Sequence, residues 1–123
     1  MLGAARAAIA VSDLDRARKF YEETLGLSAA EERPDGIRYE TGDTWFLVYP
    51  SSFAGTNQAT AMAFEVTDIE KTIDDLNGRG VTFEHYDLPG LKTDERGIVE
   101  IEDSRAAWFK DPDGNILAVD QRV

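Results

Sequence analysis

Apolar and polar residues follow the same order twice along this chain. The segment Val11–Arg16 (Val-Ser-Asp-Leu-Asp-Arg) returns as Val66–Lys71 (Val-Thr-Asp-Ile-Glu-Lys) at a constant offset. Each copy follows an apolar run typical of a strand and precedes residues with helical spacing. Two shorter pairs also recur: Gly26-Leu27 as Gly80-Val81, and Trp45-Phe46 as Trp108-Phe109. Such a repeat indicates two half-domains of one design.

The first half, about residues 1–50, predicts one strand, one helix and three further strands. Apolar residues up to Val11 predict the first strand. Ser12 offers a cap hydroxyl for a helix that places Leu14 and Tyr21 on one face and ends at Gly26. The three later strands are expected over residues 27–33, 37–41 and 44–49.

The second half, about residues 60–123, repeats this order after a linker at about residues 51–59. Thr67 is the expected cap of a helix whose apolar face includes Ile73 and Leu76. Strand candidates follow at residues 81–86, 98–102, 105–110 and 115–119, and Asp111–Gly114 predicts a hairpin turn between the last two. Halves of this size are marginal alone, so we expect a single domain, residues 1–123, with one shared core.

Charge and composition exclude several classes of function. The formal net charge is −11, which argues against binding to nucleic acid and to anionic membranes. The chain has no cysteine, so disulfides, thiolate catalysis and cysteine-based zinc sites are excluded. No apolar run approaches the roughly 20 residues that span a bilayer, and the first residues do not form a signal peptide. We expect a soluble, cytoplasmic protein.

The combined motifs resemble the vicinal oxygen chelate superfamily, which includes glyoxalase I, extradiol dioxygenases, fosfomycin-resistance enzymes and bleomycin-resistance proteins. The motifs that carry the resemblance are Val11–Asp15, Phe20-Tyr21, Leu25–Leu27, Val66–Asp68 and Asp111–Asn115. The resemblance implies an α+β fold in which two βαβββ modules form one curved mixed sheet around a cleft, with the helices packed outside. It also implies a homodimer that binds a small molecule.

Many members of that superfamily hold a divalent metal with four side chains, typically His, Gln or Glu. The four matching positions in this sequence are Arg6, Phe46, Ala61 and Ala118. A shift of one residue at any position still supplies no good ligand, and the only histidine, His85, lies on another strand. These sites need imidazole or carboxylate donors, and an arginine would repel the ion. We therefore expect neither a metal nor another cofactor.

Strand alternation outlines a cleft that is mostly small and apolar. Arg6 would share a face with Ala8 and Ala10, while Phe46 would share one with Val48. With these faces in the cleft, the ligand is expected to be uncharged or weakly anionic. The candidate ligand-binding residues are Arg6, Phe46, Val48, Ala61, Glu65, His85, Trp108 and Ala118.

Each candidate also has a structural interpretation. Arg6 is either an anion clamp or a surface residue, with an internal ion pair to Glu65 as a further alternative. His85 is either a general base or a structural residue, and one ring of each Trp-Phe pair belongs to the core. The acidic run of Glu95, Glu100, Glu102 and Asp103 is either a cation site or a solvated surface.

Three classes of function remain open. The first is a metal-free binding module that sequesters or senses an amphipathic or weakly anionic molecule, as in the bleomycin-resistance branch. The second is an enzyme of the lyase, isomerase or dioxygenase type. The third is an interaction protein whose cleft is filled by its own side chains.

Overall fold

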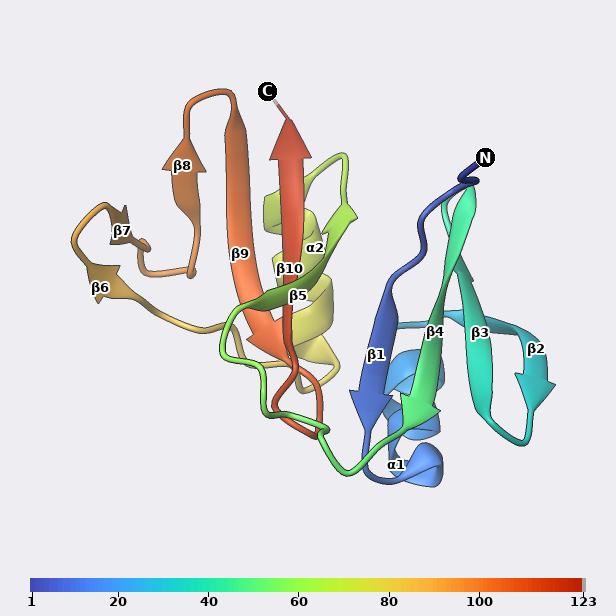
Figure 1. Ribbon diagram of the computed structural model, residues 1–123. Coiled ribbons are helices and arrows are strands. Elements are labelled where there is room, and N and C mark those ends of the chain that lie inside the picture. Colours follow the sequence, from blue (N-terminus) through green and yellow to red (C-terminus); the bar gives the residue numbers. More distant parts are fainter. Residues whose placement is uncertain (123) are drawn as a thin grey trace. The chain divides into compact units, whose positions relative to one another are not determined.

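The computed structural model describes residues 1–122. The chain divides into two compact units, and each contains a four-stranded sheet (Figure 1). Unit 1 consists of residues 1–61 together with residues 111–115, and unit 2 consists of residues 62–110 and 116–122. The order of elements repeats strand, helix and three sheet strands, which confirms the predicted α+β fold of two βαβββ modules.

The first module forms a mixed sheet in the order β1-β4-β3-β2. Strands β1 and β4 pair in parallel, and the other neighbours are antiparallel. A short π-helix, η1, continues α1. The elements are β1 (Ala8–Val11), α1 (Leu14–Arg18), η1 (Lys19–Thr24), β2 (Ser28–Arg33), β3 (Gly36–Thr41) and β4 (Thr44–Pro50).

One face of the first sheet is apolar and lies against α1 and η1 (Figure 1). The buried strand residues on that face are Ile9, Val11, Ile37, Tyr39, Phe46 and Val48. From η1, the fully buried Tyr21 stacks on Tyr39 at 5.7 Å and meets Phe46 edge-on at 5.8 Å between ring centroids. Burial stabilises the unit by about 1.5–3 kcal/mol for each large side chain.

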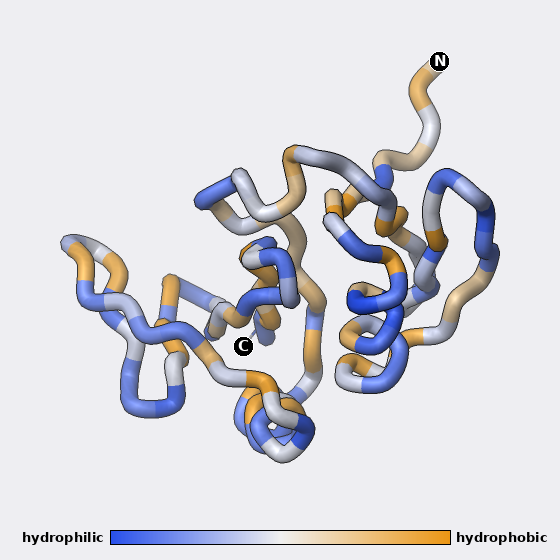
Figure 2. Tube along the Cα trace, turned by 90° about the horizontal axis from the view of Figure 1, so that it is seen from below, coloured by the Kyte–Doolittle hydropathy of each residue, from blue (hydrophilic) through white to orange (hydrophobic). Residues whose placement is uncertain are grey.

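The second module has the sheet order β5-β10-β9-β8. Its helix α2 buries Ile69, Ile73 and Leu76, as their spacing predicts. The alternation of hydrophobic and hydrophilic residues is visible along the chain in Figure 2. The elements are β5 (Thr60–Glu65), α2 (Ile69–Gly78), β6 (Asp87–Leu88), β7 (Leu91–Lys92), β8 (Val99–Ile101), β9 (Ser104–Lys110) and β10 (Ile116–Arg122).

Both helices have their N-cap one residue after the predicted cap. The Asp13 carboxylate accepts from the backbone N–H groups of Asp15 and Arg16, and the Asp68 carboxylate accepts from Lys71. A carboxylate accepts charge-assisted bonds at the positive end of the helix, which a hydroxyl does not. The predicted cap Ser12 instead bonds to Asp113.

The predicted strand at residues 81–86 is wrong. Val81 and Phe83 are buried, but Phe83 forms only an isolated bridge with Phe109. The alternation of apolar residues in this segment reflects burial of side chains in the core, because the segment forms no continuous ladder with a neighbouring strand. Residues 87–92, which follow this segment, form the hairpin β6–β7. Within residues 1–122, no helix is long and apolar enough to cross a bilayer.

Candidate functional site

The face of the first sheet opposite α1 carries polar and aromatic side chains at the surface. The strand register pairs Ala8 with Leu47, and Leu47 with Arg38, so these side chains point to the same side. All residues of this face are exposed or half-buried. We call it the open face of the first sheet, defined by Arg6, Ala8, Ala10, Glu31, Arg38, Glu40, Trp45, Leu47 and Tyr49.

The expectation that Phe46 and Val48 share a face with the Arg6 side of β1 is wrong. Phe46 is 2% exposed and Val48 is 0% exposed, and both lie in the core beneath the helix. The parallel register sets Val48 beside the buried Ile9, so the alternate side chains of β4, such as Leu47 and Tyr49, lie on the open face. Trp45 therefore replaces Phe46 as the aromatic residue on this surface.

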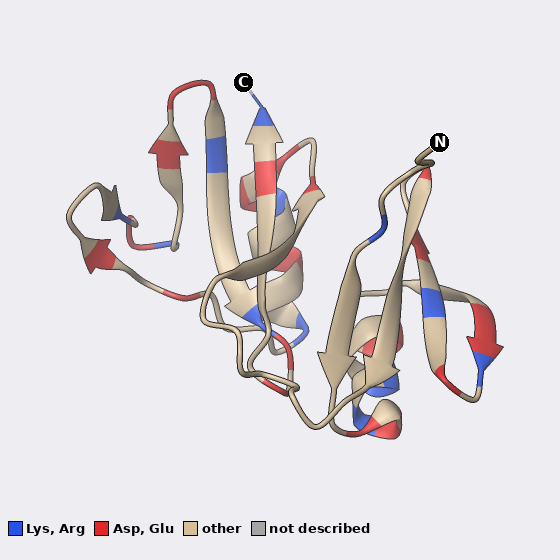
Figure 3. Cartoon of the chain, viewed as in Figure 1, with Lys and Arg blue, Asp and Glu red and all other residues tan. Residues whose placement is uncertain are grey.

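Two guanidinium groups lie over the indole of Trp45. The Cζ atom of Arg6 is 4.9 Å from the ring centroid, and that of Arg38 is 4.3 Å from it. The two arginines come from the segment before β1 and from β3, where Figure 3 shows basic residues. Each such cation–π contact contributes about 0.5–1 kcal/mol at an exposed site. The arrangement fixes two cations on one aromatic side chain.

The two arginines differ in their partners. Arg38 forms an ion pair with the Glu31 carboxylate at 3.1 Å, and Glu31 also contacts Arg33 at 3.2 Å. Arg6 donates a long hydrogen bond of 3.5 Å to the carbonyl of Ala5 and forms no ion pair within residues 1–122. The sequence alone did not identify Arg38. Its position between the buried Ile37 and Tyr39 is the alternation signal that could have found it.

The second sheet brings together two of the predicted residues. Trp108 on β9 and Ala118 on β10 are directly opposite in the antiparallel register. Their neighbours along these strands, Phe109 and Leu117, face the core. The ring of Tyr86 meets Trp108 edge-on at 5.7 Å, and burial raises the pKa of Tyr86.

The remaining predicted residues lie at separate places. Ala61 is half-buried and Glu65 is exposed, both on β5. Glu65 lines a cavity of about 430 Å³ in unit 2, with Val66, Thr67, Asp120, Gln121 and Arg122. His85 is exposed, and its Nε2 lies 3.1 Å from the carbonyl oxygen of Glu95. That nitrogen must be the donor, because a carbonyl oxygen only accepts.

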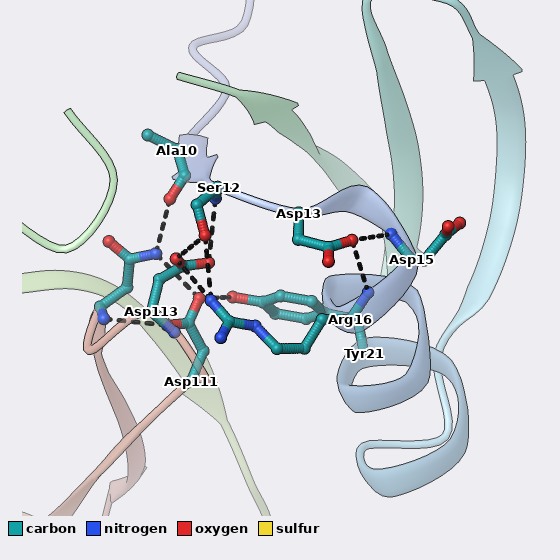
Figure 4. Close-up of polar contacts among 9 residues, drawn as sticks. Ala10, Ser12, Asp13, Asp15, Arg16, Tyr21, Asp111 and Asp113 are labelled. Carbon is teal, nitrogen blue, oxygen red and sulfur yellow. Dashed lines mark hydrogen bonds and ion pairs between the residues drawn. The ribbon is translucent and has the colours of Figure 1, made fainter. Parts of the chain in front are cut away.

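A buried polar cluster lies beside the start of α1 in unit 1 (Figure 4). Its centre is the Asp111 carboxylate, which is 4% exposed. One oxygen accepts from the Tyr21 hydroxyl and the Asn115 side-chain amide, both at 2.8 Å. The other accepts from the backbone N–H groups of Asp113 and Asn115, and Asn115 also donates to the Ala10 carbonyl. These bonds satisfy the buried charge without a cation.

The neighbouring Asp113 holds the first residues of the helix. Its carboxylate accepts from the Ser12 backbone N–H and hydroxyl, and from Arg16 at 2.8 Å.

Burial raises the pKa of Tyr21 far above its usual value, and the nearby Asp111 charge adds to that effect. The predicted hairpin turn at Asp111–Gly114 is confirmed. Its buried carboxylate was missed, because a turn motif does not reveal which partner it contacts.

Two βαβββ modules, each with a helix on one sheet face, define a class of α+β proteins built from paired modules. The chain belongs to the Glyoxalase/Bleomycin resistance protein/Dioxygenase superfamily, whose family model matches residues 3–119. This match confirms the resemblance found in the sequence.

Individual relatives are distant. The uncharacterized protein YraH of Bacillus subtilis (strain 168) is 27% identical over 124 residues, covering 89% of this chain and 90% of YraH. A glyoxalase family protein from Enterococcus faecalis has a TM-score of 0.72 at 23% identity, covering 96% of each chain. TnmS3, an antibiotic binding protein from Streptomyces sp. CB03234, has a TM-score of 0.70 at 20% identity, covering 100% of this chain and 99% of TnmS3.

The residues at the four positions that the resemblance assigns to a metal do not fit a divalent ion. Arg6, Ala61 and Ala118 offer no donor, and the corrected β4 register offers Trp45 or Leu47. No group of three or more His, Cys, Asp or Glu side chains in the described part of the chain is arranged to hold a metal.

Proposed function

We propose that this protein binds an amphipathic, weakly anionic small molecule on the open face of the first sheet, without a metal. The observation that carries the proposal is the Trp45 indole flanked by the guanidinium groups of Arg6 and Arg38. Superfamily membership and the similarity to TnmS3, an antibiotic binding protein, support a binding role.

The open face offers the two features that such a ligand requires, an apolar surface and positive charge. Along the strands from Trp45, the half-buried Leu47 and Tyr49 and the exposed Ala8 form an apolar strip. Covering about 200 Å² of apolar surface there contributes about 5 kcal/mol, before the cost of losing ligand freedom. Charged contacts at the Arg6 end then orient the ligand.

A thermal-shift screen of amphipathic aromatic compounds, with and without a chelator, tests this function. We expect a melting temperature that rises with ligand concentration and does not respond to the chelator. The Trp45→Leu variant should lose the shift, while Trp108→Leu, the matched change on the second sheet, should keep it. If no compound stabilises the protein, the binding role is wrong.

Metal analysis separates this proposal from a metal-dependent lyase, isomerase or dioxygenase. A transition metal that remains at one equivalent after dialysis would contradict the metal-free site. A turnover activity abolished by chelation would do the same.

We also propose that the chain works as a homodimer in the cytoplasm. The family resemblance supports the dimer, and the absence of cysteine fits a reducing compartment. Analytical ultracentrifugation tests the dimer, since a single species of monomer mass at micromolar concentration would contradict it.

A further inference from the structure

We propose that the ligand of the open face is a planar aromatic monoanion whose carboxylate-like group binds Arg6 and Arg38, in competition with the protein's own Glu31. This inference rests on the proposed function and names its ligand class. It makes Arg38 a specificity residue beside Arg6, and it gives Glu31 the role of an internal competitor.

The first observation is an arginine without an acidic partner in a strongly acidic chain. The formal net charge is −11, yet Arg6 forms no ion pair within residues 1–122. Its guanidinium lies over the Trp45 ring, although the residue itself is exposed. A cation held in place by an aromatic ring loses less freedom when it binds an anion.

The second observation is that Arg38 shares its acidic partner with another arginine. Arg38 lies 3.1 Å from Glu31, but Glu31 divides its two oxygens between Arg38 and Arg33. All three side chains are at least one-third exposed, so this ion pair is weak and exchangeable. A ligand carboxylate can therefore replace Glu31 at Arg38 while Glu31 keeps Arg33.

The third observation is the charge balance around the indole. Glu40 lies opposite Trp45 in the strand register, is exposed and forms no ion pair in the described part of the chain. Arg33 contacts Asp35 at 3.8 Å in addition to Glu31, so its charge is already balanced. Arg6 is the arginine of this surface with no ion pair in the described part of the chain, and one such cation fits a ligand with one negative charge better than a dianion or a neutral molecule.

The shape of the surface selects a flat ligand body. The apolar strip of Ala8, Leu47 and Tyr49 lies on a sheet face, and it begins next to the two guanidinium groups. A planar ring can cover this strip while its carboxylate reaches the arginines, whose guanidinium N–H groups donate to a carboxylate in a fork geometry. A long flexible chain would lose more conformational freedom on the same surface.

The test compares 2-naphthoate with its neutral isostere 2-naphthamide. Binding is measured by calorimetry and by the two indole N–H signals in nitrogen-15 NMR spectra, assigned with Trp108→Phe. We expect 2-naphthoate to bind about tenfold more tightly than the amide and to move the Trp45 signal. Raising the salt concentration should weaken the carboxylate and leave the amide unchanged.

Four variants locate the charge effect. Arg6→Ala and Arg38→Ala should each weaken 2-naphthoate about tenfold, and Glu31→Gln should tighten it about threefold by removing the competitor. Lys19→Ala is the charge-matched control, because Lys19 is exposed on η1 rather than on the sheet face. It should change the affinity less than twofold.

The outcomes separate the two proposals. Equal binding of carboxylate and amide, or losses in Arg6→Ala and Arg38→Ala no larger than in Lys19→Ala, would overturn the inference and leave the binding role intact. A Glu31→Gln variant that does not bind 2-naphthoate more tightly would overturn the role of Glu31. If neither probe binds and the wider screen also finds no ligand, both proposals fail.

Discussion

The two units share one strand order, but a buried carboxylate is found in unit 1 and not among the described residues of unit 2. In unit 1, the Asp111 carboxylate is 4% exposed and receives four hydrogen bonds beside the first helix (Figure 4). In unit 2, the helix carries Glu70 at the surface, where its carboxylate contacts Arg96 and Arg105. A buried, fully bonded charge fixes one geometry, whereas exposed ion pairs exchange with water.

The two tryptophans also have different surroundings. Trp45 has two arginines over its ring, whereas Trp108 lies opposite the buried Ala118 and its ring contacts Tyr86. The repeated Trp-Phe pair is also not structurally equivalent. Trp45 lies on β4, the neighbour of β1, but Trp108 lies on β9, which is one strand further from β5.

The largest expected effect comes from removing the buried carboxylate. Asp111→Ala leaves the Tyr21 hydroxyl and two backbone N–H groups without their acceptor, so we expect a loss of about 3 kcal/mol in unfolding free energy. Asp74→Ala, an exposed ion-pair partner of Arg96, is the control and should change stability by less than about 0.5 kcal/mol. Urea unfolding measures both, and equal losses would contradict the contrast between the units.

The second prediction contrasts the two tryptophans. Trp45→Leu should weaken 2-naphthoate by about 1.5 kcal/mol, roughly tenfold in Kd, because it removes the ring that holds both guanidinium groups. Trp108→Leu should change Kd less than twofold. Calorimetry measures both variants, and the reverse order of losses would move the ligand to the second sheet.

The third prediction concerns alkaline pH. Burial raises the pKa of Tyr21 in the folded protein above its unfolded value of about 10, so the unfolded chain releases this proton first. The stability from this difference is complete below pH 10 and is lost as the pH rises above it. Tyr21→Phe should cost about 1 kcal/mol at pH 7 and reduce the alkaline decline by up to about 1.4 kcal/mol per pH unit.

Urea unfolding from pH 8 to pH 11 measures this decline in both proteins. Tyr39, whose pKa is also raised by burial, retains its own share of the effect in Tyr21→Phe. An alkaline decline that is identical in both proteins would show that Tyr21 ionises equally in the folded and unfolded states.

The smallest effect is expected at the surface network of unit 2. Glu70→Gln removes the carboxylate shared by Arg96 and Arg105, and its side chain is 51% exposed. We expect a change of less than about 0.5 kcal/mol that disappears in about 0.5 M salt. A loss comparable to that of Asp111→Ala would mean that this network is as important as the buried cluster.

The sequence predicted the fold because its signals are local. The helix faces with Leu14 and Ile73 follow from spacing along one element, and the turn at Asp111–Gly114 follows from turn chemistry. The candidate site was harder to predict from the sequence. Alternation placed Phe46 and Trp45 on opposite faces but did not say which face lies under the helix, because that depends on pairing between β1 and β4.

The sequence by itself determined the repeated βαβββ plan and the apolar helix faces, since both are properties of residue type and spacing. Only the tertiary structure decided that Trp45 lies beneath Arg6 and Arg38, and that Asp111 accepts from Tyr21, 90 residues away in the chain. These contacts depend on strand register and on segments distant in sequence, which no local pattern encodes.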